Sequence, residues 1–162
     1  MRHGKAEAFA EEDQRRRLTD RGRRDAAAVG TWLAEHGLVP THAYVSSAIR
    51  ARATWEAVAE AAGADAVVSF EGSLYSAGPQ TVLDTLRTAP EDARVVMYVG
   101  HNPTAASLAH QLDDGDAEPA AFRAMSQGFP TCALAVLEVP VAWADLDTGG
   151  ARLVDFHDGH AR

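Results

Sequence analysis

Two histidines and two arginines lie in short polar clusters whose residue types suit phosphate chemistry. Arg2 and His3 precede Gly4 at the start of the chain, Arg50 ends the run Ser-Ser-Ala-Ile-Arg, and His101 lies in Gly-His-Asn-Pro. Each arginine can donate forked hydrogen bonds to phosphate oxygens. Because histidine titrates near neutral pH, one neutral imidazole can attack phosphorus while a protonated one stabilises charge on the other oxygens. The four side chains therefore predict transfer of a phosphoryl group.

The sequence contains neither a nucleotide-binding loop nor a metal-ligand pattern near these clusters. The motif Gly-x-x-x-x-Gly-Lys-Ser/Thr is absent, and no Asp and His residues occur near the clusters at metal-ligand spacing. The single cysteine, Cys132, lies in an apolar stretch and is expected in the core. We therefore expect chemistry without a metal or another cofactor.

The clusters can meet only if each follows a strand of the same sheet. Apolar spacing and turn residues predict strands over residues 43–45, 66–70 and 95–99, and helices over residues 19–36, 51–62, 79–88, 104–112 and 119–124. Two more strands, over residues 132–139 and 152–157, should form an antiparallel pair. The predicted fold is α/β, a mostly parallel central sheet with helices on both faces and an antiparallel C-terminal strand. Parallel strands end at one edge, where ligands bind, and the clusters converge there.

Length, charge and hydropathy limit the classes of partner. A chain of 162 residues fits one domain, residues 1–162. Its net charge of -8 disfavours binding to nucleic acid or to an anionic membrane surface. No apolar run reaches the roughly 18 residues of a membrane span, and the start lacks the apolar region of a signal peptide. We therefore expect a cytoplasmic protein whose partner is a phosphorylated protein or a small phosphorylated substrate.

Five motifs occur together and in a fixed order along the chain. They are Arg-His-Gly-Lys-Ala-Glu at 2–7, Leu-Thr-Asp-Arg-Gly at 18–22, Ser-Ser-Ala-Ile-Arg-Ala-Arg-Ala-Thr at 46–54, Leu-Tyr-Ser-Ala at 74–77 and Val-Gly-His-Asn-Pro-Thr at 99–104. With Pro-Thr-Cys-Ala from position 130, they make nearly the whole chain resemble the histidine phosphatase superfamily, and within it the small bacterial phosphohistidine phosphatases of the SixA type. The resemblance implies a fold like that of phosphoglycerate mutase.

The resemblance also implies a role for each matching residue. It implies four catalytic residues, the nucleophile His3 with Arg2, Arg50 and His101 around the phosphate, and two substrate-binding residues at the rim, Arg21 and Asn102. The implied reaction is metal-independent hydrolysis of protein phosphohistidine through a phosphorylated His3, with no cofactor.

One departure from the larger relatives bears on the substrate. Phosphoesterases and mutases of the family carry a proton-donating glutamate two positions after the leucine of the third-strand loop, where this chain has Ser76. An alkoxide needs a general acid to leave, whereas the imidazole of a phosphohistidine leaves readily. The sequence therefore favours phosphoramidates, with Glu71 as an alternative proton donor close by in sequence.

Two other functions remain open at this point. One is a small-molecule phosphatase that acts on phosphoanhydrides or activated esters. The other is a catalytically weak module that binds phosphate without turnover. Hydrolysis of a phosphohistidine protein, compared with p-nitrophenyl phosphate and sugar phosphates, would separate the three.

The first strand departs from the family pattern. Arg-His-Gly normally follows an apolar strand that is central in the sheet, whereas only Met1 precedes Arg2 here. We expect the first strand to be truncated before Arg2, either because the reading frame begins upstream or because the sheet lacks a central member. The strands that lead to Ser46 and Gly100 should then flank the missing strand, and its absence would expose their edges.

Overall fold

Helices and strands alternate along most of the chain, as the apolar spacing predicts. The computed structural model describes residues 1–160. The elements in chain order are η1 (Asp13–Arg15), α1 (Asp20–Glu35), β1 (His42–Ser46), α2 (Ile49–Ala62), β2 (Val67–Glu71), η2 (Gly72–Leu74), α3 (Pro79–Leu86), β3 (Val96–Val99), α4 (Thr104–Leu112), α5 (Pro119–Ser126), β4 (Leu134–Glu138), η3 (Trp143–Asp145) and β5 (Arg152–His157). Each predicted helix and strand is therefore present. None of the helices in residues 1–160 is long and apolar enough to cross a membrane.

The strands form two small sheets. One has the order β2-β1-β3 with parallel pairing, in which Tyr44 lies opposite Ser69 on one side and Tyr98 on the other. The other is the antiparallel pair β4-β5, with an irregularity between Val136 and Leu137. The α/β fold and the antiparallel pair are thus confirmed, although β3 and β4 belong to separate sheets.

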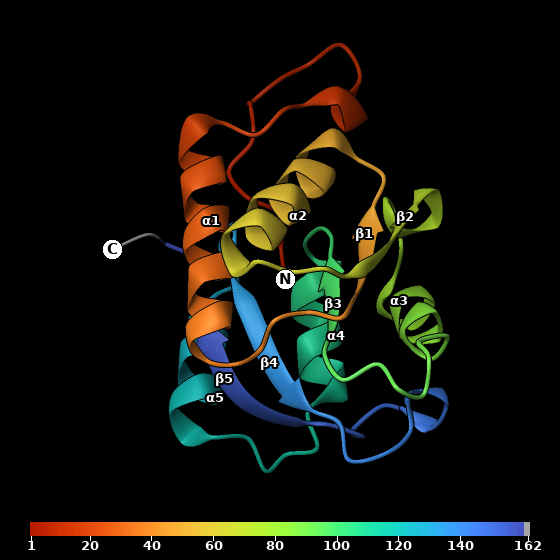
Figure 1. The fold of residues 1–162 in the computed structure, drawn as a ribbon. Coiled ribbons are helices and arrows are strands. Elements are labelled where there is room, and N and C mark those ends of the chain that lie inside the picture. Colours follow the sequence, from red (N-terminus) through yellow and green to blue (C-terminus); the bar gives the residue numbers. More distant parts are fainter. Residues whose placement is uncertain (161–162) are drawn as a thin grey trace.

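Helices cover both faces of the parallel sheet (Figure 1). The helices α1 and α2 pack on one face, where Met97 and Val99 of β3 join their apolar side chains. The helices α3 and α4 lie on the other face, toward which Tyr98 points, and α5 packs against β5. This alternation along β3 is the period of two that a strand with two covered faces requires. The predicted layers are confirmed.

Local sequence signals explain several element ends. The Thr19 hydroxyl accepts a hydrogen bond of 3.1 Å from the Gly22 N–H and caps the start of α1. Gly63 ends α2 in the left-handed region, with φ of +63°. Pro79 occupies the first turn of α3, where its missing N–H leaves no bond unmade.

Residues 1–3 lie between β3 and the segment that leads into β4. The Gly100 N–H donates to the Met1 carbonyl at 3.1 Å, and the His3 N–H donates to the Gly100 carbonyl at 2.9 Å. On the other side, the Arg2 N–H donates to the Ala133 carbonyl at 3.0 Å. Residues 1–3 therefore join the two sheets.

The expected neighbours of the first strand are partly wrong. The strand that leads to Ser46 is β1, and it pairs directly with β3 rather than with the start of the chain. The flanking strands are β3, which leads to Gly100, and β4. Because β1 already pairs on both of its edges, with β2 and β3, it has no free edge for a further strand.

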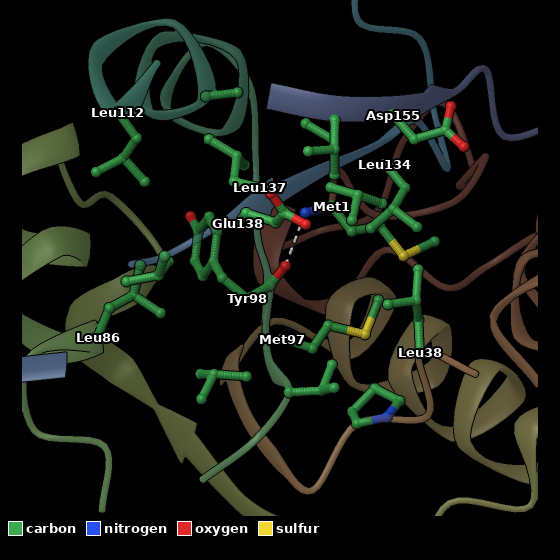
Figure 2. Close-up of a pocket in the computed structure, with 18 of the residues that line it drawn as sticks. Met1, Leu38, Leu86, Met97, Tyr98, Leu112, Leu134, Leu137, Glu138 and Asp155 are labelled. Carbon is green, nitrogen blue, oxygen red and sulfur yellow. Dashed lines mark hydrogen bonds between the residues drawn. The ribbon is translucent and has the colours of Figure 1, made fainter. Parts of the chain in front are cut away.

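An apolar cavity of about 590 Å³ lies next to Met1, between β3 and β4 (Figure 2). Met97 of β3, Leu134 of β4 and Leu38 are among the residues that line it. The amino group of Met1 donates to the Tyr98 carbonyl at 2.8 Å. Complete burial lowers the pKa of this ammonium group from 8.0 to about 5.

Candidate active site

His3 presents one ring nitrogen to Arg50 at the carboxyl end of the parallel sheet. Its Nδ1 lies 2.8 Å from the Gly4 carbonyl oxygen, which can only accept, so Nδ1 carries the proton. The other nitrogen, Nε2, is left with a lone pair and accepts a hydrogen bond of 3.2 Å from Nε of Arg50. The local backbone therefore selects the tautomer that a nucleophile requires.

Two glycines of the motifs allow the His3 segment to pass close to α1. A Cβ on Gly22 would lie 2.1 Å from the Lys5 carbonyl oxygen, and a Cβ on Gly4 would lie 2.8 Å from the Gly22 carbonyl oxygen. Both distances are shorter than side chains tolerate. The glycines of Arg-His-Gly and Leu-Thr-Asp-Arg-Gly thus serve one backbone contact that holds the nucleophile in place.

Thr54 ties the His3 segment to α2. Its hydroxyl accepts from the Gly4 N–H at 2.9 Å and donates to the Arg50 carbonyl at 2.6 Å. The side chain is fully buried. The threonine at the end of the 46–54 motif therefore fixes the separation of nucleophile and arginine, a role that sequence reasoning missed although the motif contained it.

Arg50 lies at the centre of the site, on the first turn of α2. Its side chain is only 6% exposed. Besides the bond to His3, NH2 lies 3.4 Å from Nδ1 of His101, while NH1 and NH2 donate to the backbone and the carboxylate of Asp13. The guanidinium therefore contacts both imidazoles and one acidic side chain.

His101 follows β3 directly and faces His3, with 5.1 Å between the ring centroids. Its Nε2 lies 2.7 Å from the hydroxyl of Ser46, which is fully buried. Gly100 makes this placement possible, because a Cβ there would lie 2.0 Å from the hydroxyl oxygen of Tyr98. Ser46 is a second positioning residue that sequence reasoning did not single out.

Arg2 and Asn102 share one backbone acceptor. NH1 of Arg2 and Nδ2 of Asn102 donate to the Phe129 carbonyl at 3.0 and 2.9 Å. The Nε atom of Arg2 is buried and has no hydrogen-bond partner within the described part of the chain. Arg2 thus retains an unused donor beside His3, and Asn102 contacts the carbonyl that holds Arg2.

Burial keeps both imidazoles neutral in the ligand-free site. Desolvation lowers the pKa of His3 to about 3, with smaller contributions from the neighbouring charges of His101, Arg50 and Arg2. Desolvation also lowers the pKa of His101 to about 4, and Arg50 adds to the effect. Desolvation lowers the pKa of the Arg2 guanidinium as well. The site has excess positive charge that a bound anion would offset.

Arg21 does not join this group. It lies on the first turn of α1 with a 65% exposed side chain, and its Nε is 3.5 Å from a carboxylate oxygen of Asp25 on the same helix. The structure thus brings together Arg2, His3, Arg50 and His101, with Asn102 behind Arg2, and leaves Arg21 on the outer surface.

Asp13 and Tyr75 belong to the site although sequence reasoning did not select them. The Tyr75 hydroxyl donates to Oδ2 of Asp13 at 2.6 Å, and the Tyr75 ring meets the His101 ring edge-on at 5.5 Å. Tyr75 was part of a matched motif, whereas Asp13 had no signal beyond its acidic type. Ser76 is exposed, and the Glu71 backbone carbonyl accepts from the Ser47 N–H at 3.1 Å. Within residues 1–160, no group of three or more potential ligands could hold a metal ion.

Sequence and structural relatives match almost the whole chain. The chain is 35% identical over 161 residues to the uncharacterized protein Rv1276c of Mycobacterium tuberculosis, which covers 97% of this chain and 98% of the relative. It is 34% identical to a solved structure described as "Putative Phosphohistidine Phosphatase SixA" from Nakamurella multipartitia, with a TM-score of 0.86 over 97% of this chain and 92% of that one. A second SixA structure of the same description, from Agrobacterium tumefaciens, is 30% identical with a TM-score of 0.79 over 97% and 94% of the two chains.

Residues 1–71 match the family described as histidine phosphatase superfamily, branch 1. The chain belongs to the histidine phosphatase superfamily. The matched segment contains Arg2, His3 and Arg50, whereas His101 and Asn102 lie beyond it. In this histidine phosphatase, the later residues reach the site because β3 lies next to β1 in the sheet.

Proposed function

We propose that this histidine phosphatase, as one catalytic domain in the cytoplasm, hydrolyses protein phosphohistidine without a metal and through a phosphate carried on Nε2 of His3. The observation that carries the proposal is the state of His3. Its Nδ1 proton is committed to the Gly4 carbonyl, its Nε2 lone pair lies at the Arg50 guanidinium, and its lowered pKa keeps the ring neutral. A neutral imidazole beside an arginine is a nucleophile placed next to a phosphate-binding group.

In the first step, Arg2 and Arg50 hold the phosphoryl oxygens while Nε2 of His3 attacks phosphorus. The new N–P bond forms as the bond to the leaving group breaks, and the electron pair of that bond goes to the leaving atom. A dianion beside His101 raises the pKa of that imidazole, because an opposite charge favours the protonated form. His101 then donates to a phosphoryl oxygen in place of its present contact with Arg50.

In the second step, a water molecule attacks the phosphorus of phosphorylated His3. The O–P bond forms, the N–P bond breaks with its electron pair returning to Nε2, and the water protons end on inorganic phosphate and solvent. The site is then restored with His3 neutral. Neither step calls for a metal ion or a nucleotide.

The acid–base state of the site supports a nitrogen leaving group. Ser76 stands where the larger relatives carry a proton donor, and Asp13 is the carboxylate that contacts the pocket. Hydrogen bonds from Tyr75 and Arg16 hold the pKa of Asp13 below its ordinary range, so it stays ionised and has no proton to give. A leaving group that departs without an external proton, such as imidazole, fits this site better than an alkoxide.

The decisive experiment is to trap the phosphorylated enzyme. Rapid quench of wild type with a phosphohistidine protein should give a bound phosphate that is labile in acid and persists in base. His3→Ala should abolish both the adduct and turnover, and the exposed-site control His110→Ala should keep both. EDTA should leave the rate unchanged. If His3→Ala keeps more than a few per cent of activity and wild type yields no adduct, the proposal is wrong.

A further inference from the structure

A short loop places one carboxylate against Arg50 of the candidate site. Residues 7–17 leave the His3 segment and return to α1. Their base is closed by the Ala6–Leu18 bridge and by a hydrogen bond of 2.9 Å that the Glu7 N–H donates to the Arg17 carbonyl. Nε of Arg16 also donates to the Glu7 carbonyl at 2.7 Å. The loop, which we call the 7–17 loop, is therefore held at its base and carries Asp13 at the site.

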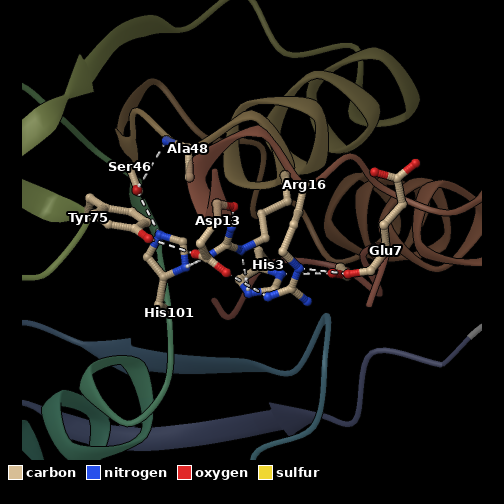
Figure 3. Close-up of polar contacts among 10 residues, drawn as sticks. His3, Glu7, Asp13, Arg16, Ser46, Ala48, Tyr75 and His101 are labelled. Atoms are coloured by element: carbon tan, nitrogen blue, oxygen red, sulfur yellow. Dashed lines mark hydrogen bonds and ion pairs between the residues drawn. The ribbon is translucent and has the colours of Figure 1, made fainter. Parts of the chain in front are cut away.

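Four donors from three side chains hold Asp13, which lies beside Tyr75 and Arg16 in Figure 3. NH1 and NH2 of Arg50 donate to its backbone carbonyl at 2.7 Å and to Oδ2 at 2.9 Å. The Tyr75 hydroxyl donates to Oδ2 at 2.6 Å, and NH1 of Arg16 donates to Oδ1 at 2.9 Å. The carboxylate is nevertheless 50% exposed, on the solvent side of a nearly buried Arg50.

The charge of Asp13 is a permanent feature of this pocket. The hydrogen bonds from Tyr75 and Arg16, with a further one from Arg50, all favour the ionised form. A phosphoryl dianion bound between Arg50, His3 and His101 would therefore lie beside a negative charge. Such a neighbour weakens binding of every plain phosphate and ester, because like charges repel.

A substrate that carries positive charge next to its phosphorus would reverse this effect. Phosphohistidine is such a substrate, since its second ring nitrogen can hold a proton and point that N–H outward. An oxygen ester of an alcohol has neither the charge nor the N–H at that position. Each carboxylate oxygen of Asp13 can accept more than one hydrogen bond, and Oδ1 accepts one from Arg16.

We propose that Asp13 is a specificity-determining residue that selects phosphoramidates, by accepting the hydrogen bond of the protonated leaving group and by opposing dianions that lack one. The inference rests on the proposed function and names the side chain that contacts the leaving group. The N–P bond of the substrate breaks as the His3 N–P bond forms, and its electron pair goes to the ring nitrogen. The proton on the opposite ring nitrogen stays in place, so the product is neutral imidazole and no proton donor is needed.

The test compares two substrates in variants of one position. Asp13→Asn keeps the shape and an acceptor oxygen but removes the charge, whereas Asp13→Glu keeps the charge. Glu12→Gln is the matched control, because it removes one charge from the same loop but pairs with Arg15 at 3.0 Å and not with Arg50. Initial rates are measured with phosphohistidine and with p-nitrophenyl phosphate, and the affinity for inorganic phosphate is measured by calorimetry.

We expect Asp13→Asn to lower the ratio of kcat/KM for phosphohistidine to that for p-nitrophenyl phosphate by about tenfold or more. Asp13→Asn should also raise the affinity for inorganic phosphate by up to about tenfold, because it removes one partly exposed negative charge beside the anion. Asp13→Glu should retain more of the wild-type ratio than Asp13→Asn, and Glu12→Gln should retain all of it.

Parallel changes for the two substrates would overturn the proposal. Rates that rise together would show that Asp13 only blocks the pocket, and rates that fall together would show that it only positions Arg50. An equal decrease of the kcat/KM ratio in Asp13→Asn and Asp13→Glu would exclude a role for the negative charge of Asp13. If wild type itself fails to turn over phosphohistidine, the proposed function fails, whereas the phosphate affinities still report on the charge of Asp13.

Discussion

A strand added before Met1 should stabilise the chain of residues 1–162, and the gain should depend on pH. Within residues 1–160, the edge of β3 that faces β4 pairs only with residues 1–3. The apolar cavity of about 590 Å³ continues from Met1 along this edge. The perturbation is an extension of four apolar residues, Val-Leu-Val-Leu, ahead of Met1. It would fill the cavity and continue the hydrogen bonds that now end at Met1 and Tyr98.

Part of the gain in unfolding free energy comes from the amino group of Met1. With a free terminus, the ammonium pKa is 8.0 when unfolded and about 5 in the fold, so the unfolded chain binds the extra proton between these values. Stability is therefore unaffected above pH 8.0 and is lost as the pH falls from 8.0 toward 5. At 1.36 kcal/mol per pKa unit, the loss is about 1.4 kcal/mol at pH 7 and about 3.5 kcal/mol at pH 5. An extension turns this ammonium into an uncharged amide and removes the loss.

The cavity adds a gain that does not depend on pH. Burying an aliphatic side chain is worth roughly 1.5 to 3 kcal/mol, and ordering each residue costs about 1 to 2 kcal/mol of backbone entropy. Four residues therefore leave a net gain of a few kcal/mol at most.

The assay is urea unfolding of the two chains at pH 5, 7 and 9. The difference in unfolding free energy should be smallest at pH 9 and should grow by about 3.5 kcal/mol at pH 5. His3 and His101 titrate in both chains, so their contributions cancel in the difference. A Gly-Ser-Gly-Ser extension is the control, since it removes the buried charge without filling the cavity. A difference that stays constant from pH 9 to pH 5 would refute the assignment of a buried ammonium at Met1.

Three further predictions concern the site. Arg50→Ala and His101→Ala should each lower kcat by about 10² to 10³ in steady-state kinetics, the usual loss when a transition-state stabiliser is removed. Losses below tenfold in both variants would exclude these residues from catalysis. Ser76→Glu should raise hydrolysis of alkyl esters relative to phosphohistidine, and an unchanged ratio would mean that another group supplies the proton. Because His3 and His101 have pKa values of about 3 and 4, below the ordinary 6.5, the unfolded chain binds more protons below pH 6.5, so Tm should fall as the pH is lowered from 6.5 to 4. His101→Gln should weaken that dependence.

The sequence by itself predicted the elements and the convergence of four candidate residues, Arg2, His3, Arg50 and His101. Thr19, Gly63 and Pro79 mark helix ends through backbone preferences that act within a few residues, and the structure places a boundary at each. The apolar run of β3 requires cover on both faces, and it has that cover. The catalytic candidates were found because residues after parallel strands share one edge of a sheet, a rule that needs no coordinates.

Only the tertiary structure decided which strands are neighbours and which further side chains reach the pocket. The pairing of β1 with β3 depends on how both faces are covered, so the expected place of β1 beside the start of the chain was wrong. Arg21 belongs to a matched motif, but its side chain lies on the outer surface, because its position on α1 directs the side chain away from the site. Asp13 lay in a loop with no periodic signal, and it reaches Arg50 through the fold of the 7–17 loop. Contacts between segments far apart in the chain depend on packing, which local residue preferences do not specify.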